Sequence, residues 1–430
     1  MNDTLLISSE EMKVSDLAEH ITGSEIIKLA GEINEKLRKG EKIYNLTIGD
    51  FNPNLFPLPE ELKKYIIEAY INNETNYPPA DGVLTLRESV SSFLKKRQGV
   101  NYAANNILIA GGARPLIYAA YQVLVNPGEY VLFPVPSWNN NHYTYLTHAK
   151  QLFIETKPEH NFMPTADELK PHIQQAGLVA LCSPLNPTGT TFTKKDLKEI
   201  CQLILEENDR RSHNNQKPLY LLYDQVYWTL TFGDTQHHDP VSLYPEMKPF
   251  TIFIDGLSKA FAATGIRVGW AFGPTKIMDK MKSILGHVGA WSPKAEQVAT
   301  AIYLKQDQQV ESYQAWLKSE IHKRLKAFYD GFMDLKKEGF PVDAIAPQAA
   351  IYLTVQLNLI GKRTSSGSII KKTTDITNYI LNDAKIAMVP FAAFGASTNS
   401  TWYRISVGAC KLEEISAIME SLKNSLKKLS

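Results

Sequence analysis

The sequence is poor in cysteine, in long apolar runs and in net charge, and each shortage excludes a class of protein. Its 3 cysteines are widely spaced and form no CxxC pair, so we expect free thiols rather than a disulfide framework. No apolar run approaches the roughly 20 residues that a membrane-spanning helix needs. With 46 basic and 45 acidic residues the formal charge is +1, which gives no electrostatic reason to expect nucleic acid or a membrane as a partner.

Targeting and metal-binding patterns are missing as well. The N-terminal stretch MNDTLLISSEEMKVSDLAEH lacks the basic and apolar segments of a signal peptide, so we expect a cytoplasmic protein. The histidines, including His237 and His238, show no ligand spacing such as HExxH, and we expect no metal site. Cys182 follows an apolar run, which indicates a packed thiol rather than a nucleophile.

What the sequence does contain is a regular alternation between about residues 60 and 310. Amphipathic helical patterns such as KKDLKEICQLILEEN alternate with short apolar runs bounded by Gly, Pro or Asp. The runs are ILIAGG, YVLFP, LVALCSP, LYLLYD, TIFIDG and VGWAFG. Each run alone fits a buried helix segment equally well. Together they favour strands buried on both faces of a mostly parallel sheet that is sandwiched by helices.

The pattern changes after about residue 310. A long helical pattern over 311–339 precedes the run AAIYLTVQL, a predicted helix near 368–383, the run WYRISVGA and a terminal helix. We therefore predict an α/β fold with a large domain over 61–310 and a smaller α+β domain over 311–430. Residues 1–60 are expected to form an N-terminal segment that packs with the smaller domain.

Chemically useful side chains follow the predicted strands, where open α/β sheets bind their ligands. After ILIA, the pair Gly111 and Gly112 opens a helix, and the backbone N–H groups of Ala113 and Arg114 there suit an anion such as phosphate. The other strand ends supply a flat aromatic ring, an amide, a carboxylate, a phenol, a hydroxyl, a lysine and an arginine: Trp138, Asn186, Asp224, Tyr227, Ser258, Lys259 and Arg267.

Lys259 decides between two interpretations of this set. An ammonium beside a buried apolar run is costly, so Lys259 is either a solvated turn residue or a partly desolvated amine with a chemical role. Pyridoxal phosphate uses every group in the set. It needs a lysine for its aldehyde, a carboxylate for its pyridine nitrogen, donors for its phenolate oxygen, a stacking ring and an anion site.

The order NPTG, YDQVY, SKAFAATGIRVG and WYRISVG resembles that of the class I/II aminotransferases, in the aspartate aminotransferase superfamily of fold type I. The resemblance extends from LTIGDFNP to the C-terminal helix. Each motif alone is weak, and the combination is specific. It implies pyridoxal 5'-phosphate as cofactor and the fold type I large domain around it.

The resemblance also implies a role for each residue. Lys259 would hold the cofactor as a Schiff base and move the substrate proton, and Asp224 would pair with the pyridine nitrogen. Tyr227 and Asn186 would bond the phenolate oxygen, and Trp138 would stack on the ring. The phosphate would be held by Arg267, Ser258 and the turn of Gly112, Ala113 and Arg114.

Substrate and partner residues follow from the same resemblance. Arg404 would bind the substrate α-carboxylate through its planar fork, with Asn186 and Gly49 in the same pocket. Tyr77 would reach the phosphate of a neighbouring subunit, which implies a homodimer with shared active sites. The alternatives are an Arg404 that forms a structural ion pair and a Tyr77 that is simply packed.

Three positions depart from the family pattern. Gly256 stands where the family commonly has a Ser or Thr phosphate ligand, and Ala113 lacks the usual hydroxyl or amide. Gln225 replaces the glutamate of the common YDEVY, which we interpret as the loss of a charge near the ring. The phosphate site is therefore expected to depend on backbone amides and on Arg267.

The predicted activity is transamination between an L-amino acid and a 2-oxo acid by a ping-pong mechanism, with glutamate and 2-oxoglutarate as the expected second pair. A β-lyase or another fold type I enzyme is the alternative, and a cofactor-binding regulator lacks a DNA-binding segment. The segment GHVGAWSPKAEQ offers Lys294 but no second arginine for a dicarboxylate, with Trp291 and His287 nearby. This favours an aromatic or neutral substrate, with aspartate as the alternative.

Overall fold

The computed structural model describes residues 13–21, 23 and 25–430 of the chain. Residues 1–12, 22 and 24, which belong to the expected N-terminal segment, lie outside the described residues. Among the described residues, no helix is long and apolar enough to cross a membrane.

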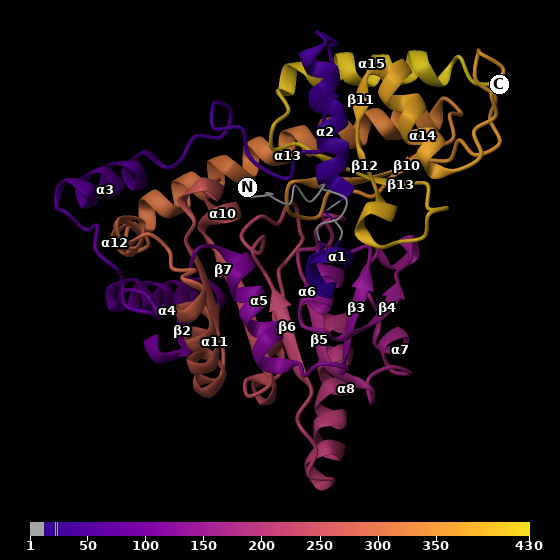
Figure 1. Cartoon of the computed structure of the whole chain (residues 1–430). Helices are drawn as coiled ribbons and strands as arrows, with labels where there is room; N and C mark the ends of the chain where they lie inside the picture. Colours follow the sequence, from indigo (N-terminus) through magenta and orange to yellow (C-terminus); the bar gives the residue numbers. More distant parts are fainter. Residues whose placement is uncertain (1–12, 22, 24) are drawn as a thin grey trace, which may run out of the picture.

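A seven-stranded sheet forms the centre of the larger part of the molecule (Figure 1). Its strand order is β2–β8–β7–β6–β5–β3–β4, and every neighbouring pair is parallel except those that involve β8. The predicted mostly parallel sheet is thus confirmed. The strands are β2 (Ile107–Ala110), β3 (Tyr130–Val135), β4 (Lys150–Glu155), β5 (Ala176–Cys182), β6 (Tyr220–Asp224), β7 (Thr251–Gly256) and β8 (Gly269–Phe272).

The seventh strand, β4, was not among the predicted runs. It lies at the sheet edge beside β3, and its residues alternate between exposed and half-buried positions. Continuous apolar runs are typical of strands that are buried on both faces of a sheet. An edge strand such as β4 lacks this pattern and was therefore not predicted.

Helices cover both faces of this sheet, as predicted. Ile107 and Ile109 of β2 pack into one core with α3, α4, α8 and α12, whereas Leu108 and Ala110 pack into another with α5, α6 and α11. The helices of this part are α3 (Glu60–Ile71), α4 (Leu84–Gln98), α5 (Ala113–Leu124), α6 (Asn140–Leu146), α7 (Ala166–Leu169), α8 (Lys194–His213), α9 (Pro240–Leu243), α10 (Leu257–Ala260), α11 (Thr275–Val288) and α12 (Lys294–Tyr303).

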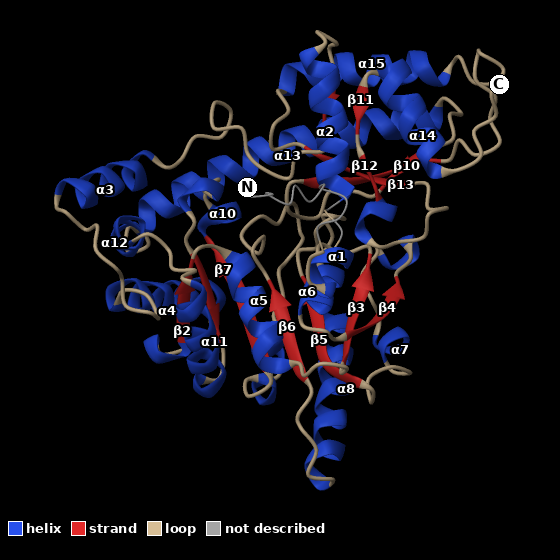
Figure 2. Cartoon of the chain, viewed as in Figure 1, coloured by secondary structure: helices blue, strands red, loops and turns tan. Residues whose placement is uncertain are grey.

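A smaller antiparallel sheet of order β12–β13–β10–β9 lies beyond the carboxyl ends of β3, β4 and β6 (Figure 2). Its strands are β9 (Val342–Ala344), β10 (Tyr352–Leu357), β12 (Val389–Pro390) and β13 (Trp402–Ser406). It shares a third core with α13 (Asp307–Lys337), α14 (Thr373–Tyr379) and α15 (Ile415–Leu426). The helix predicted near 368–383 begins later, at Thr373, and continues as a π-helical turn over Ile380–Ala384.

The described part of the N-terminal segment contacts both parts of the molecule: near its start, the Leu17 carbonyl accepts a hydrogen bond from the Tyr145 hydroxyl of the larger part at 2.9 Å, and later residues contact the smaller part. The segment contains α1 (Asp16–His20), α2 (Glu25–Arg38) and β1 (Tyr44–Asn45). β1 pairs in parallel with β11 (Ile386–Ala387), and Ile33 of α2 packs with Leu381 and Ala387. This pairing fixes the chain just before Gly49, which is a predicted site residue.

Among the contacts that hold the larger and smaller parts together, two joints bear on the position of the site. The 31-residue helix α13 contributes Val310 to the first core and Leu317 and Ile321 to the core of the smaller sheet. At the second joint, Ala349 N–H donates to the Gly189 carbonyl at 2.9 Å, and Thr354 Oγ1 donates to the Thr188 carbonyl at 2.8 Å. The NPTG turn is therefore bonded directly to β10.

Gly189 offers a test of the second joint. Its φ is +71°, and a Cβ there would overlap the carbonyl oxygen of Tyr352. We expect Gly189→Ala to lower the midpoint of thermal unfolding by several degrees, since both backbone strain and the overlap oppose folding. Gly367→Ala is the matched control, because Gly367 has φ +86° but no atom within 4 Å of the position that a Cβ would take. Equal shifts for the two variants would contradict the close approach.

Candidate active site

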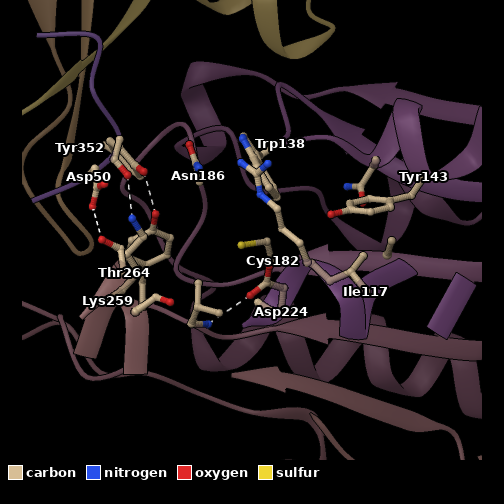
Figure 3. A pocket seen from close by; sticks show the side chains of 18 of the residues that line it. Asp50, Ile117, Trp138, Tyr143, Cys182, Asn186, Asp224, Lys259, Thr264 and Tyr352 are labelled. Atoms are coloured by element: carbon tan, nitrogen blue, oxygen red, sulfur yellow. Dashed lines mark hydrogen bonds between the residues drawn. The ribbon is translucent and has the colours of Figure 1, made fainter. Parts of the chain in front are cut away.

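A cavity of about 630 Å³ opens at the carboxyl ends of the central strands. It brings together residues from five strand ends of the large sheet, from the segment before α3 and from the smaller sheet. The predicted site residues that line it are Gly49, Ala113, Arg114, Trp138, Asn186, Asp224, Tyr227, Ser258, Lys259, Arg267 and Arg404. Figure 3 shows Lys259, Asp224 and Trp138 arranged around this common space.

Lys259 lies in the one-turn helix α10, directly after β7. Its Nζ donates a hydrogen bond to the Gly49 carbonyl at 2.7 Å and lies 5.8 Å and 5.9 Å from the ring centroids of Phe51 and Tyr227. Burial lowers the pKa of Lys259 to about 8. The nearby carboxylate of Asp50 raises this pKa, whereas the guanidinium groups of Arg404, Arg114 and Arg267 lower it further. The amine is thus desolvated rather than a solvated turn residue.

Asp224 ends β6 and faces the cavity beside Cys182 (Figure 3). Its Oδ1 accepts a hydrogen bond from the Val226 N–H at 3.1 Å, which lowers the pKa of this carboxyl group. Burial is the larger effect and raises the pKa to about 6. A buried carboxylate with little protein compensation is stabilised by a cationic partner, so Asp224 suits a protonated ring nitrogen.

Arg404 comes from β13 in the smaller sheet and is 2% exposed. Its Nη1 donates to Asn186 Oδ1 at 3.0 Å and its Nη2 to the Thr47 carbonyl at 2.6 Å. These partners are an amide and a carbonyl rather than a carboxylate, in contrast to the ion-pair alternative. Its Nε is buried without a partner among the described residues, so the guanidinium keeps a free donor.

The expected phosphate-binding residues include a turn and an arginine that contact each other. Gly112 has φ +95°, and a Cβ on it would overlap the guanidinium of Arg267. Arg267 donates from Nη2 to the Gly111 carbonyl and from Nη1 to the Thr264 carbonyl, each at 2.8 Å. Gly112 is not itself at the cavity wall, but it allows Arg267 to lie against the N-terminus of α5.

Comparison with known proteins agrees with this geometry. The family model described as aminotransferase class I and II matches residues 41–422. This chain belongs to that family. The predicted resemblance is confirmed, and the protein is a transaminase.

Named relatives and solved structures are similar along almost the whole chain. The probable aspartate/prephenate aminotransferase of Rhizobium leguminosarum bv. phaseoli is 28% identical over 91% of this chain and 94% of its own length. The aspartate aminotransferase of Geobacillus stearothermophilus is 27% identical over 95% of this chain and 100% of its own length. The solved aspartate aminotransferase of Rhizobium meliloti has a TM-score of 0.86 at 26% identity, covering 97% of this chain and 100% of its own.

The structure adds cavity residues that sequence reasoning missed. Tyr352 from β10 lies with its hydroxyl oxygen 2.7 Å from that of Tyr227, and Thr264 Oγ1 donates to Asp50 Oδ1 at 2.6 Å (Figure 3). Cys182 also lines the cavity, and burial raises the pKa of its thiol, as fits an unreactive wall residue. Tyr352 stood within a predicted strand, but no sequence signal indicated that it faces the aminotransferase site.

Two other predictions need separate accounts. Tyr77 does not line the cavity and is 81% exposed. Its ring packs edge-on against that of Trp291, with 5.2 Å between the ring centroids. Lys294, which pairs with Glu74 at 2.8 Å, belongs to the same surface region.

The interpretation of Gln225 as a lost charge near the ring is wrong, because its Nε2 donates to Gln98 Oε1 at 3.0 Å and its side chain does not line the cavity.

The burial of Lys259 generates a pH prediction. We expect its amine, in the protein free of small molecules, to titrate near pH 8, well below the ordinary value of 10.5. The measurement is NMR of reductively ¹³C-methylated protein across pH, with Lys259→Ala to assign the resonance. Arg404→Met should raise the pKa, because a neighbouring positive charge is removed. A Lys259 resonance that titrates together with those of the surface lysines would contradict the desolvated environment.

Proposed function

We propose that this transaminase uses pyridoxal 5'-phosphate and exchanges an amino group between an L-amino acid and a 2-oxo acid by a ping-pong mechanism. The observation that carries the proposal is a desolvated lysine, Lys259, in one cavity with the buried carboxylate of Asp224 and the guanidinium of Arg404. Glutamate and 2-oxoglutarate form one substrate pair.

The charges of the cavity fit this cofactor. Four cationic side chains line it, Arg114, Lys259, Arg267 and Arg404, against the two carboxylates of Asp50 and Asp224. An excess of positive charge in a partly desolvated site favours bound anions, such as a phosphate and a substrate carboxylate. The turn at Gly112 and the side chains of Arg267 and Ser258 would hold the phosphate, Asp224 the ring nitrogen, Tyr227 and Asn186 the phenolate oxygen, and Trp138 the ring face.

Each of three residues in the cavity has a separate role in this reaction. Arg404 orients the amino acid by its α-carboxylate, using donor capacity that the protein leaves free. The bound cofactor supplies an electron sink for the substrate Cα. Lys259, with its pKa lowered to about 8, would be the base that takes the proton from the substrate Cα and the acid that later gives it up. Asp224 remains ionised at neutral pH because its own pKa is about 6.

Arg114 indicates the class of substrate. Its guanidinium lies 4.6 Å from the Trp138 ring centroid at the cavity wall, and within the described part of the chain it has no carboxylate partner. Its backbone N–H serves the phosphate turn, so the side chain is free to meet a second carboxylate. Arg114 lies outside the segment GHVGAWSPKAEQ, where a cation for the second carboxylate was expected. We therefore favour an acidic amino acid such as aspartate over the aromatic or neutral substrate first expected.

The same proposal includes a homodimer. Tyr77 is exposed on its own chain, although its loop is held by Lys294, which bonds Asn76 Oδ1 at 2.6 Å. A fixed and exposed tyrosine suits a contact with the phosphate site of a second subunit. Tyr77 would then complete a site that it does not reach within one chain.

The experiment that tests the proposal is the visible absorption spectrum of the purified protein with single L-amino acids. We expect the cofactor band to bleach and a 2-oxo acid to restore it. Lys259→Ala should slow both changes at least about 100-fold, because the positioned proton carrier is lost. Lys282→Ala, a surface lysine paired with Asp279, is the control. Bleaching with release of ammonia would favour a lyase, and no band even after adding pyridoxal phosphate would overturn the proposal.

Arg114→Met tests the substrate class. We expect kcat/KM for L-aspartate to fall by a factor of about 10 to 100, since a hydrogen bond to a charged group is lost, while kcat/KM for L-phenylalanine changes little. Steady-state kinetics with both substrates and a titration of pyridoxal phosphate give the answer. Equal losses for both substrates, with weaker cofactor binding, would assign the Arg114 side chain to the phosphate instead.

A further inference from the structure

Tyr352 brings a hydroxyl group from the smaller sheet to the wall of the candidate active site. It lies on β10, where it pairs with Ser406 of β13, and its side chain is buried. A Cβ on Gly49 would lie 2.9 Å from the hydroxyl oxygen of Tyr352, so a side chain at position 49 would displace this oxygen. The strand and the nearby Gly49 backbone therefore leave the hydroxyl little freedom to move.

Tyr352 Oη has one hydrogen-bond partner among the described residues, the hydroxyl of Tyr227. The two oxygens are 2.7 Å apart, which is the usual length of a hydrogen bond between hydroxyl groups. Each hydroxyl has one hydrogen to give and can also accept. Because only one of the two hydrogens can lie between the oxygens, the direction of this bond decides what Tyr227 offers to the cavity.

The two directions have opposite consequences for a ligand in the cavity, which both tyrosines line. If Tyr352 donates, the hydrogen of Tyr227 is free to point at the ligand. If Tyr227 donates, its oxygen presents only lone pairs, which do not bind an anionic oxygen. Tyr227 is the residue expected to bond the phenolate oxygen of the proposed cofactor. That role requires the first direction.

The guanidinium of Arg404 favours donation by Tyr352. Its Cζ lies 4.6 Å from the centroid of the Tyr352 ring, and a neighbouring cation makes a phenol more acidic. Burial raises the pKa of both phenols, that of Tyr227 well above its usual range. Their mutual hydrogen bond raises the pKa of Tyr227 further and lowers that of Tyr352. Tyr352 is thus the more acidic hydroxyl of the pair and the better donor.

We propose that Tyr352 is a positioning residue, which donates its hydroxyl hydrogen to Tyr227 and thereby turns the hydrogen of Tyr227 toward the phenolate oxygen of the bound cofactor. The inference rests on the proposed function, because it assumes pyridoxal 5'-phosphate in this cavity. Tyr352 acts only through Tyr227. Successive hydrogen bonds in such a chain polarise one another, so Tyr227 donates more strongly than a phenol without this partner.

The test is a pH titration of the visible band of the holoenzyme without substrate. A donor to the phenolate oxygen makes this oxygen less basic, so the proton held beside it is lost at a lower pH. Tyr352→Phe keeps the ring beside Arg404 and removes only the hydroxyl. We expect it to raise the midpoint of the titration by roughly 0.2 to 0.6 pH unit, the effect of one bond in a chain on its neighbour.

Two further variants isolate this effect. Tyr227→Phe should raise the midpoint by more, and adding Tyr352→Phe to it should cause no further rise, because the second hydroxyl acts through the first. Tyr403→Phe is the matched control and should leave the midpoint unchanged. Tyr403 is also buried and lies on β13, and its hydroxyl donates to the Thr373 carbonyl at 3.1 Å, away from the cavity.

Each other outcome overturns the inference in a recognisable way. A lower midpoint in Tyr352→Phe would mean that Tyr352 accepts from Tyr227 and competes with the cofactor. An unchanged midpoint with a raised KM for the 2-oxo acid would place the Tyr352 hydroxyl on the substrate. A further rise in the double variant would show an action independent of Tyr227. No cofactor band in the unmodified protein would overturn the proposed function as well. Circular dichroism confirms that each variant is folded.

Discussion

The active site depends on one unfavourable arrangement, an amine buried among cations. Lys259 is desolvated, and the guanidinium groups of Arg404, Arg114 and Arg267 oppose its protonation. This makes the amine available as a nucleophile and base near neutral pH, which a solvent-exposed lysine is not. The same excess of positive charge would attract the phosphate and the carboxylate of the proposed cofactor and substrate. A single electrostatic feature thus serves both reactivity and binding.

Such a cluster cannot hold itself together, so the fold has to hold it. Arg404 belongs to the smaller sheet, whereas Lys259 lies in α10 directly after β7 and Arg267 lies in the turn before β8, both in the larger part. The two sheets are joined by α13, which packs into both cores, and by the close approach of Gly189 to β10. The hydroxyl contact between Tyr227 and Tyr352 crosses the same boundary. Packing far from the site therefore positions the charges within it.

Most of the site could be predicted from sequence because parallel strands place their carboxyl ends at one edge. Asp224, Lys259 and Asn186 follow buried apolar runs, and the structure brings them into one cavity. Tyr352 and the pair of Asp50 with Thr264 were missed because only tertiary packing brings them there. Gln225 was wrongly expected near the ring. Successive side chains of a strand point to opposite faces, so Gln225 faces away from the cavity that Asp224 lines. β4 was missed because an edge strand is not continuously apolar.

The backbone around Gly256 leaves little room for a side chain. A Cβ on Gly256 would lie 2.9 Å from the Cα of Gly269, and a Cβ on Gly269 would lie 2.8 Å from the Ala113 nitrogen. The glycines on β7 and β8 thus let these strands approach the turn that opens α5. A serine or threonine at position 256 would collide with the backbone of the neighbouring strand β8 at Val268 and Gly269. In the proposed cofactor site, a phosphate would then be held by the N–H groups of α5 and by Arg267 rather than by a hydroxyl at position 256.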